Sequence, residues 1–243
     1  MAEIRTDWVN LQVADGTSMR AYVARPQDGA PRAGLLVFQE AFGVNAHIRE
    51  VTERFGREGH YALAPELFHR TAPGFEGAYN NFEAVMPHMR ALTEEGLEAD
   101  ARSAYAWLRE KLGAPEIPLA CIGFCMGGRV SFLTNSILPV KAAVLFYGGG
   151  IAPNPMTPGL LNRARDLHAP QLLFWGGLDK HIGPEQRQAV VEALGKAGRP
   201  FVNVEFSDAD HGFFCDVRPS YNPAAAQQAW VLTHAFLNYY LGS

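Results

Sequence analysis

The sequence is poor in cysteine and has no long hydrophobic run. Its three cysteines, Cys121, Cys125 and Cys215, cannot all pair, so we expect no disulfide framework. Their spacing matches no zinc-binding pattern, and Cys121 is expected to lie in the core. No uncharged segment approaches the ~18 residues that a membrane span needs, and the first residues lack the hydrophobic region of a secretory signal. These absences predict a cytoplasmic protein without a metal ion and without membrane contact.

Clusters of basic residues are also missing. The 25 acidic residues outnumber the 21 basic ones, the formal net charge is −4, and no run of lysines or arginines occurs. A surface that binds polyanions needs such a cluster, so we expect no nucleic-acid partner. No internal repeat, linker or low-complexity segment divides the 243 residues, and their 48% hydrophobic content suits one domain over residues 1–243.

The order of hydrophobic patterns predicts the fold class. Alternating apolar and polar residues at 8–13 and 19–23, on either side of Asp15-Gly16, predict an antiparallel hairpin. A continuous hydrophobic run typical of a buried parallel strand follows at residues 34–38, and further strands are predicted at residues 61–64, 117–122, 142–147, 171–175 and 201–206. Helical spacing predicts helices at residues 45–59, 97–112, 129–138 (amphipathic), 184–198 and 222–241. This alternation predicts an α/β fold: a mostly parallel sheet of about eight strands with helices on both faces.

One segment does not follow this alternation. Residues 65–93 have no clean period and contain several prolines and glycines. We expect them to form an excursion that shapes the substrate pocket.

The segment Gly123-Phe124-Cys125-Met126-Gly127 stands between a predicted strand and a predicted helix. This is the G-x-S-x-G pattern of a nucleophile elbow, with cysteine in place of serine. Glycine is needed on both sides because a Cβ there would collide with the neighbouring strand or helix. The positive end of a helix favours a thiolate and an adjacent oxyanion. Cys125 is therefore the candidate nucleophile, and the Met126 amide is a candidate oxyanion donor.

A nucleophile needs a base, and the base needs an orienting carboxylate, in the chain order nucleophile, acid, histidine. Asp179 follows the strand at 171–175, and His211 follows the strand at 201–206. His181 is the main competitor for the base, but it lies only two residues from Asp179, too close to align between that carboxylate and Cys125. Solvated or capping roles are expected for five other histidines: His47, His60, His69, His88 and His234.

Glu40 and Ala41 follow the first predicted parallel strand, the position that supplies the second oxyanion donor in this architecture. We assign that donor to the Ala41 amide. Glu40 is either an ordinary surface carboxylate or part of the site. A charge at the end of a buried strand is costly unless it is paired, which favours the site.

These segments resemble the dienelactone hydrolase family, the carboxymethylenebutenolidase-like branch of the α/β hydrolases, nearly from end to end. The resemblance rests on Gln39-Glu40, Phe42 to Asn45, Gly123 to Gly128, Tyr147-Gly148, Gly177 with Asp179, and Asp210 to Phe213. It implies the α/β-hydrolase fold, a triad of Cys125, Asp179 and His211, contact between Glu40 and the resting thiol, and no cofactor. Substrate contacts are expected from Phe42, Tyr147, Phe213 and Arg218.

The sequence departs from the family in one respect. The family member that opens dienelactone holds the substrate carboxylate with two arginines. Here no arginine or lysine lies between Thr71 and Met89, Cys215 occupies the position four after His211, and Arg218 is displaced. The activity class follows from the resemblance, but dienelactone as the substrate does not.

The expected reaction is hydrolysis of a small ester or lactone through an acyl-thioester on Cys125, by a monomer or weak homo-oligomer. Two other readings stay open. A ligand-binding protein of the same fold retains the pocket without turnover. A redox-sensing thiol needs a resolving cysteine, which Cys215 supplies if the histidine loop folds over the elbow.

Overall fold

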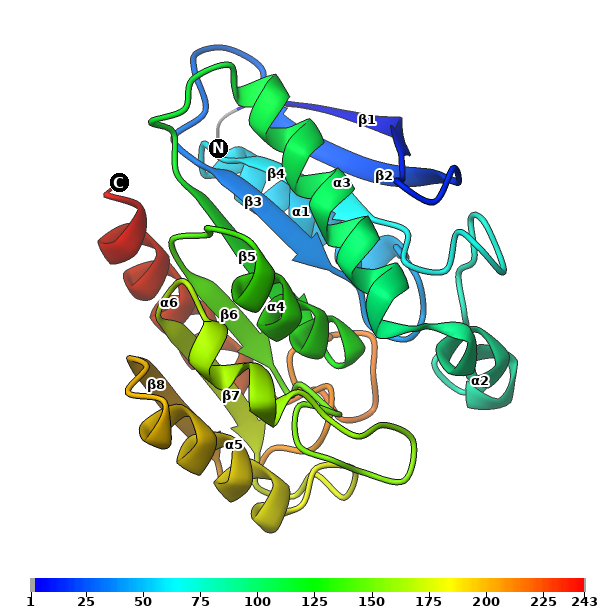
Figure 1. The fold of residues 1–243 in the computed structure, drawn as a ribbon, viewed down its shortest axis with the longest axis vertical. Helices are drawn as coiled ribbons and strands as arrows, with labels where there is room; N and C mark the ends of the chain where they lie inside the picture. Colours follow the sequence, from blue (N-terminus) through cyan, green and yellow to red (C-terminus); the bar gives the residue numbers. More distant parts are fainter. Residues whose placement is uncertain (1–2, 243) are drawn as a thin grey trace. The chain divides into compact units, whose positions relative to one another are not determined.

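The computed structural model describes residues 3–242, in which eight strands form one sheet in the order β1-β2-β4-β3-β5-β6-β7-β8 (Figure 1). The strands are β1 (Ile4–Gln12), β2 (Ser18–Pro26), β3 (Gly34–Phe38), β4 (Tyr61–Pro65), β5 (Leu119–Phe124), β6 (Ala143–Phe146), β7 (Gln171–Gly176) and β8 (Phe201–Phe206). β1 pairs antiparallel with β2, and β2 with β4, while the β3–β4, β6–β7 and β7–β8 pairs are parallel. The predicted mostly parallel sheet with an N-terminal antiparallel hairpin is confirmed.

The helices are α1 (Ala46–Arg57), α2 (Phe82–Ala91), α3 (Glu94–Leu112), α4 (Met126–Ile137), α5 (Pro184–Lys196) and α6 (Pro223–Leu241), with a 3₁₀ helix η1 (Leu161–Asp166). The chain divides into two compact units, Met1–Cys121 (unit 1) and Ile122–Ser243 (unit 2). Within unit 1, α3 lies in front of the strands and α1 behind them, and within unit 2, α4 and α5 lie in front and α6 behind (Figure 1). The single domain over residues 1–243 stays a prediction.

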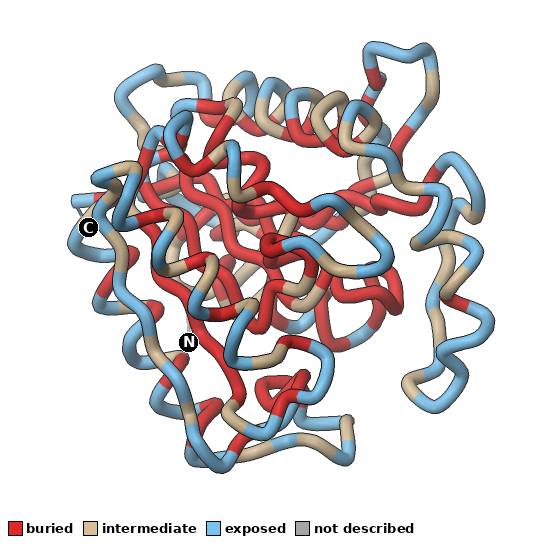
Figure 2. The backbone as a smooth tube through the Cα atoms, turned by 60° about the horizontal axis from the view of Figure 1, so that its bottom comes forward, coloured by how far each residue is buried: buried red, intermediate tan, exposed pale blue. Residues whose placement is uncertain are grey.

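Burial explains why the strands carry different sequence patterns. Every residue of β3, β5, β6 and β7 is buried, as their continuous hydrophobic runs predict. β1 and β8 stand at the ends of the strand order and are half exposed. Figure 2 shows buried backbone running through the interior and exposed backbone on outer turns and loops. Among residues 3–242, no helix has the length and hydrophobicity that crossing a bilayer demands.

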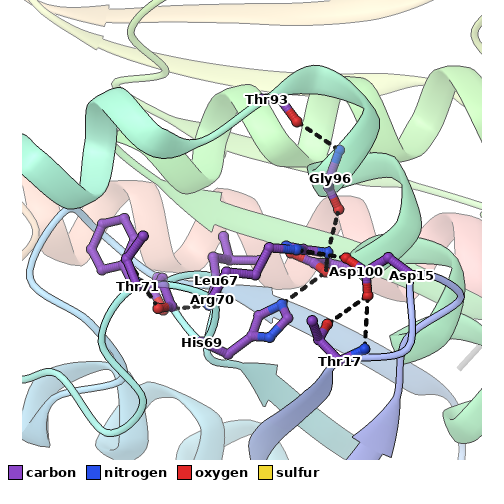
Figure 3. A network of polar contacts seen from close by, with 11 residues as sticks. Asp15, Thr17, Leu67, His69, Arg70, Thr71, Thr93, Gly96 and Asp100 are labelled. Carbon is purple, nitrogen blue, oxygen red and sulfur yellow. Dashed lines mark hydrogen bonds and ion pairs between the residues drawn. The ribbon is translucent and has the colours of Figure 1, made fainter.

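Within unit 1, Arg70 links the β1–β2 turn to α3 (Figure 3). Its guanidinium donates to both oxygens of Asp100, at 2.8 and 2.9 Å, and to Asp15 Oδ2 at 2.7 Å. The Nε2 atom of His69 lies 3.1 Å from Asp100 Oδ1. Asp100 is fully buried, and a buried carboxylate is tolerated only with such partners. The network therefore secures the hairpin to the helix.

The excursion at residues 65–93 contains a helix that the sequence analysis missed. α2 begins after Asn81, whose side chain accepts a hydrogen bond from the Ala84 amide at 3.3 Å, and it contains Pro87. A proline inside a helix removes one backbone hydrogen bond and disrupts the pattern used to recognise helices. Val85 is the buried residue of α2, and Met89, four residues later, packs partly buried against the same cluster, so the hydrophobic face of this helix is short.

Two further expectations were wrong because tertiary packing overrides local pattern. α4 is not amphipathic, since ten of its twelve residues are buried, and its polar Asn135 exchanges hydrogen bonds with the Ala169 backbone at 2.9 and 3.0 Å. Solvated or capping roles were expected for His47, His60 and His69, but all three are buried, so the solvated role is wrong for them.

The Arg70 network predicts an unequal response of two carboxylates on α3. Asp100→Ala should lower the free energy of unfolding by about 3 kcal/mol, because it leaves buried donors without their acceptor. Glu110→Ala is the matched control, since the Glu110 side chain is 72% exposed and pairs with Lys111 at the surface, and it should change stability by less than about 0.5 kcal/mol. Urea unfolding measures both values, and equal values would contradict the structural role of the network.

Candidate active site

The connection between β5 and α4 has the backbone geometry of a strained elbow. Cys125 stands between the two elements with φ 54° and ψ −118°, a region that residues other than glycine rarely adopt. Its amide donates to the Phe146 carbonyl at 3.0 Å, and its own carbonyl accepts from the Gly128 amide at 3.0 Å. These bonds hold Cys125 at the start of α4, where its side chain remains partly exposed.

The elbow needs glycine for steric reasons. A Cβ on Gly123 would collide with the Gly127 carbonyl and lie 2.8 Å from the Gly128 nitrogen. This collision agrees with the predicted requirement for glycine before the nucleophile. A second requirement was missed: a Cβ on Gly128 would lie 2.8 Å from the Gly148 Cα, so the first turn of α4 packs directly on the backbone that follows β6.

Asp179 lies in the loop after β7, and its two carboxylate oxygens have different partners. Oδ1 accepts from the backbone amides of His181 at 2.7 Å and Ile182 at 3.0 Å. Oδ2 lies 2.8 Å from Nδ1 of His211. Burial raises the pKa of Asp179, but the hydrogen bond and charge of His211 and the two amides outweigh it, so the pKa lies below its ordinary value. The loop thus fixes one oxygen and presents the other to the histidine.

His211 lies in the loop after β8 and connects Asp179 to Cys125. Burial lowers the pKa of His211, but the negative charge of Cys125 and the hydrogen bonds to Asp179 and Cys125 raise it from 6.5 to about 10. Because Nδ1 is engaged by Asp179, the other ring nitrogen remains for the Cys125 sulfur. The structure therefore brings Cys125, His211 and Asp179 into one hydrogen-bonded chain within unit 2.

His181 occupies a different place from His211. It is exposed, its ring lies 5.3 Å from the His211 ring, and its contact with Asp179 is made by the backbone amide. The side chain of Asp179 therefore contacts the ring of His211 and not that of His181, and His211 is the histidine that the sequence favours as the base.

The aromatic residues expected at the substrate lie against the histidine. Tyr147 has a φ of 38°, and its ring lies 5.1 Å from His211 and 5.3 Å from Phe213. Both aromatic residues are fully buried, so in this structure they support the histidine loop from the interior. The guanidinium of Arg218 packs against Gly212, which follows His211 and has a φ of 78°. A cationic, partly exposed side chain therefore stands beside the histidine.

Three other predicted site residues follow β3 in unit 1. Glu40 and Ala41 are fully buried and Phe42 is 3% exposed, so Glu40 is not an ordinary surface carboxylate. The Phe42 ring packs on Tyr79, with 4.6 Å between ring centroids. Contacts of these residues with the thiol and the substrate remain predictions.

The model of the dienelactone hydrolase family matches residues 19–241. The chain belongs to the dienelactone hydrolase family. Two relatives provisionally named carboxymethylenebutenolidases agree: one from Synechocystis sp. is 37% identical over 91% of this chain and 89% of its own length, and one from Escherichia coli K12 is 36% identical over 89% and 81%.

A solved structure supports the same relationship. The crystal structure of a provisionally assigned dienelactone hydrolase from Klebsiella pneumoniae superposes with a TM-score of 0.87 and 30% identity, covering 98% of this chain and 100% of that one. The predicted α/β-hydrolase fold and the predicted dienelactone-hydrolase-like enzyme are confirmed.

The electrostatics of His211 predict how its titration responds to substitution. Below about pH 6.5 the charged ring stabilises the fold fully, and this contribution is lost as the pH rises through about 10, because the folded pKa exceeds the ordinary value. Cys125→Ala and Asp179→Asn should each lower the midpoint of the His211 ring titration measured by NMR, and Cys125→Ala should lower it more. His181→Ala serves as the control. A wild-type midpoint near 6.5, or a larger drop in Asp179→Asn, would disprove this account of the charges.

Proposed function

We propose that this member of the dienelactone hydrolase family hydrolyses carboxylic esters or lactones with Cys125 as its nucleophile. The observation that supports the proposal is the hydrogen-bonded chain from Asp179 through His211 to Cys125, which ends at a strained, partly exposed elbow. A buried carboxylate that orients an imidazole beside a thiol is the arrangement that nucleophilic acyl transfer requires.

The first half of the proposed reaction forms an acyl-thioester. The Cys125 thiolate attacks the carbonyl carbon, and the carbonyl electron pair moves to its oxygen. When the tetrahedral intermediate collapses, the bond to the alcohol oxygen breaks, and the His211 imidazolium gives its proton to that oxygen. Asp179 keeps the imidazole oriented and stabilises its charged form.

The second half releases the acid. Neutral His211 takes a proton from water as the water attacks the thioester carbonyl. Collapse of this intermediate breaks the carbon–sulfur bond, which yields a carboxylic acid and restores the thiolate and imidazolium. Overall, one water molecule cleaves one ester or lactone bond and yields a carboxylic acid and an alcohol, which stay in one molecule when the substrate is a lactone.

Oxyanion stabilisation is proposed for the Met126 amide. Met126 is the first residue of α4, and the first amides of a helix have no acceptor within the helix. Such an N–H stabilises an oxyanion that forms at the adjacent residue. The Ala41 amide remains the predicted second donor, and the contact of Glu40 with the resting thiol likewise remains a prediction.

We further propose that the preferred substrates are small lactones or activated esters that bear a carboxylate. The names of the curated relatives describe an unsaturated lactone with a carboxyl-bearing substituent. The two arginine positions of the family member that opens dienelactone are not filled in this sequence, but the Arg218 guanidinium stands against Gly212, next to the proposed base. A guanidinium in that place suits a carboxylate.

Loss of the thiol tests the proposed nucleophile. Cys125→Ala should reduce kcat for p-nitrophenyl acetate roughly 10⁴-fold or more and eliminate the acylation burst, because the covalent intermediate can no longer form. Cys215→Ala is the matched control, since Cys215 is a fully buried thiol in the same unit, and it should retain the burst. Turnover in Cys125→Ala would remove Cys125 from the mechanism. The absence of a burst in the wild-type protein would favour the ligand-binding reading, and loss of the burst in Cys215→Ala would favour the redox reading.

Removal of the Arg218 charge tests the proposed substrate class. For a pair of lactones that differ only in a carboxylate, Arg218→Met should lower kcat/KM for the carboxylated lactone by about 5-fold and leave the uncharged lactone within about 2-fold, since one exposed ion pair contributes about 1 kcal/mol. Arg163→Met, a change of another partly exposed arginine in the same unit, is the control. An equal effect on both lactones would remove Arg218 from carboxylate recognition.

A further inference from the structure

A buried arginine holds both ends of the loop that carries Asp179. Arg187 stands on the first turns of α5 and is 7% exposed. One terminal nitrogen of its guanidinium, Nη1, donates to the Gly176 carbonyl at 3.2 Å and to the Ile182 carbonyl at 2.8 Å. Gly176 ends β7, and Ile182 closes the loop before α5, so a single group spans the loop.

These two carbonyls belong to peptide segments that also bind Asp179. The Gly176 carbonyl accepts from the Asp179 amide at 3.3 Å, and the Ile182 amide donates to Asp179 Oδ1 at 3.0 Å. Arg187 therefore contacts the same residues that fix the main chain and the carboxylate of Asp179. A shift of either carbonyl would be transmitted to the Oδ2 atom that faces His211.

Glu205 holds the other side of the guanidinium. Its Oε2 lies 3.2 Å from Arg187 Nε, and its Oε1 accepts from Nη2 at 3.4 Å. Glu205 stands on β8, the strand that leads to the His211 loop. The planar fork of an arginine can meet a carboxylate on one side and two carbonyls on the other, whereas a lysine offers one point of attachment. The geometry thus favours arginine at this position.

We propose that Arg187 is a positioning residue of the hydrolytic reaction, which holds the Asp179 loop so that the carboxylate stays aligned with His211. The inference rests on the proposed function. Arg187 does not itself touch the reacting atoms. Its loss should lower kcat, because the imidazole is less well oriented, and leave KM nearly unchanged, because no substrate contact is lost.

The chain offers a matched control for a purely structural arginine. Arg109 on α3 also clamps a loop, with its guanidinium Nη1 donating to the carbonyls of Ala114, Pro115 and Ile117 at 3.4, 3.3 and 2.6 Å. None of the proposed catalytic residues lies in that loop. Arg109→Met thus removes the same kind of clamp and should affect stability without changing kcat.

The experiment compares Arg187→Met, Arg187→Lys and Arg109→Met with the wild-type enzyme. For p-nitrophenyl acetate, Arg187→Met should lower kcat by about 10- to 100-fold with KM within about 2-fold, the size expected for misplaced catalytic groups. Arg187→Lys should recover part of the loss, because an ammonium still donates to a carbonyl. The low-field proton NMR signal of His211 Nδ1–H, which reports its bond to Asp179, should broaden or shift in Arg187→Met and remain in Arg109→Met.

The outcomes separate this inference from the proposed function. Unchanged kcat and an unchanged His211 signal in Arg187→Met would overturn it, as would an equal loss of kcat in Arg109→Met. If Arg187→Met does not fold, the test rests on Arg187→Lys. A wild-type kcat together with an unperturbed His211 signal in Arg187→Lys would then overturn the inference. If Cys125→Ala keeps its turnover, the proposed function fails, and the His211 signal alone then decides the role of Arg187.

Discussion

The hydrogen bond between Asp179 and His211 is the constraint on which unit 2 depends most, because it joins loops from two strands. β7 and β8 are parallel and in register, so both loops leave the sheet at the same edge. A backbone hydrogen bond also joins the two loops, since the Leu178 amide donates to the Ala209 carbonyl at 2.9 Å. Gly176 permits it, since a Cβ there would lie 2.6 Å from the same carbonyl oxygen. Strand register and an absent side chain together set the 2.8 Å separation of acid and base.

Buried aspartate–histidine pairs occur at Asp100 and at Asp179 in the described residues, and they have different roles. At Asp100, both carboxylate oxygens are also bound by Arg70, a permanent cation, so His69 adds a contact without becoming the main counter-charge. At Asp179, backbone amides bind one oxygen, and the ring of His211 is the cation at the other. The His211 imidazolium, with a pKa of about 10, can give up its proton during a reaction, whereas a guanidinium stays charged. The Asp100–His69 pair therefore suits a role in stability, and the Asp179–His211 pair suits proton transfer.

The sequence predicts those features that depend on local pattern. The buried strands and the elbow at Cys125 each leave a signal within a few neighbouring residues, and the structure shows both. Asp179 and His211 could be predicted because the acid and the base must follow the nucleophile in that order and must each stand just after a strand. Pro87 concealed α2, and the burial of α4 depends on what surrounds it. Arg187 left no signal, since its contacts arise only when strand, loop and helix close on one another.

The strained backbone of Cys125 also bears on folding. A positive φ at a residue with a side chain is unfavourable in an unfolded chain and persists only where surrounding bonds enforce it. Here the bond to the Phe146 carbonyl at the end of β6 enforces it, and the next residue, Tyr147, is tied to the Phe174 carbonyl of β7 at 2.8 Å. The thiol therefore reaches its working orientation only after three strands have assembled. An incomplete folding intermediate that lacks β6 or β7 would therefore carry Cys125 without the backbone geometry of the elbow.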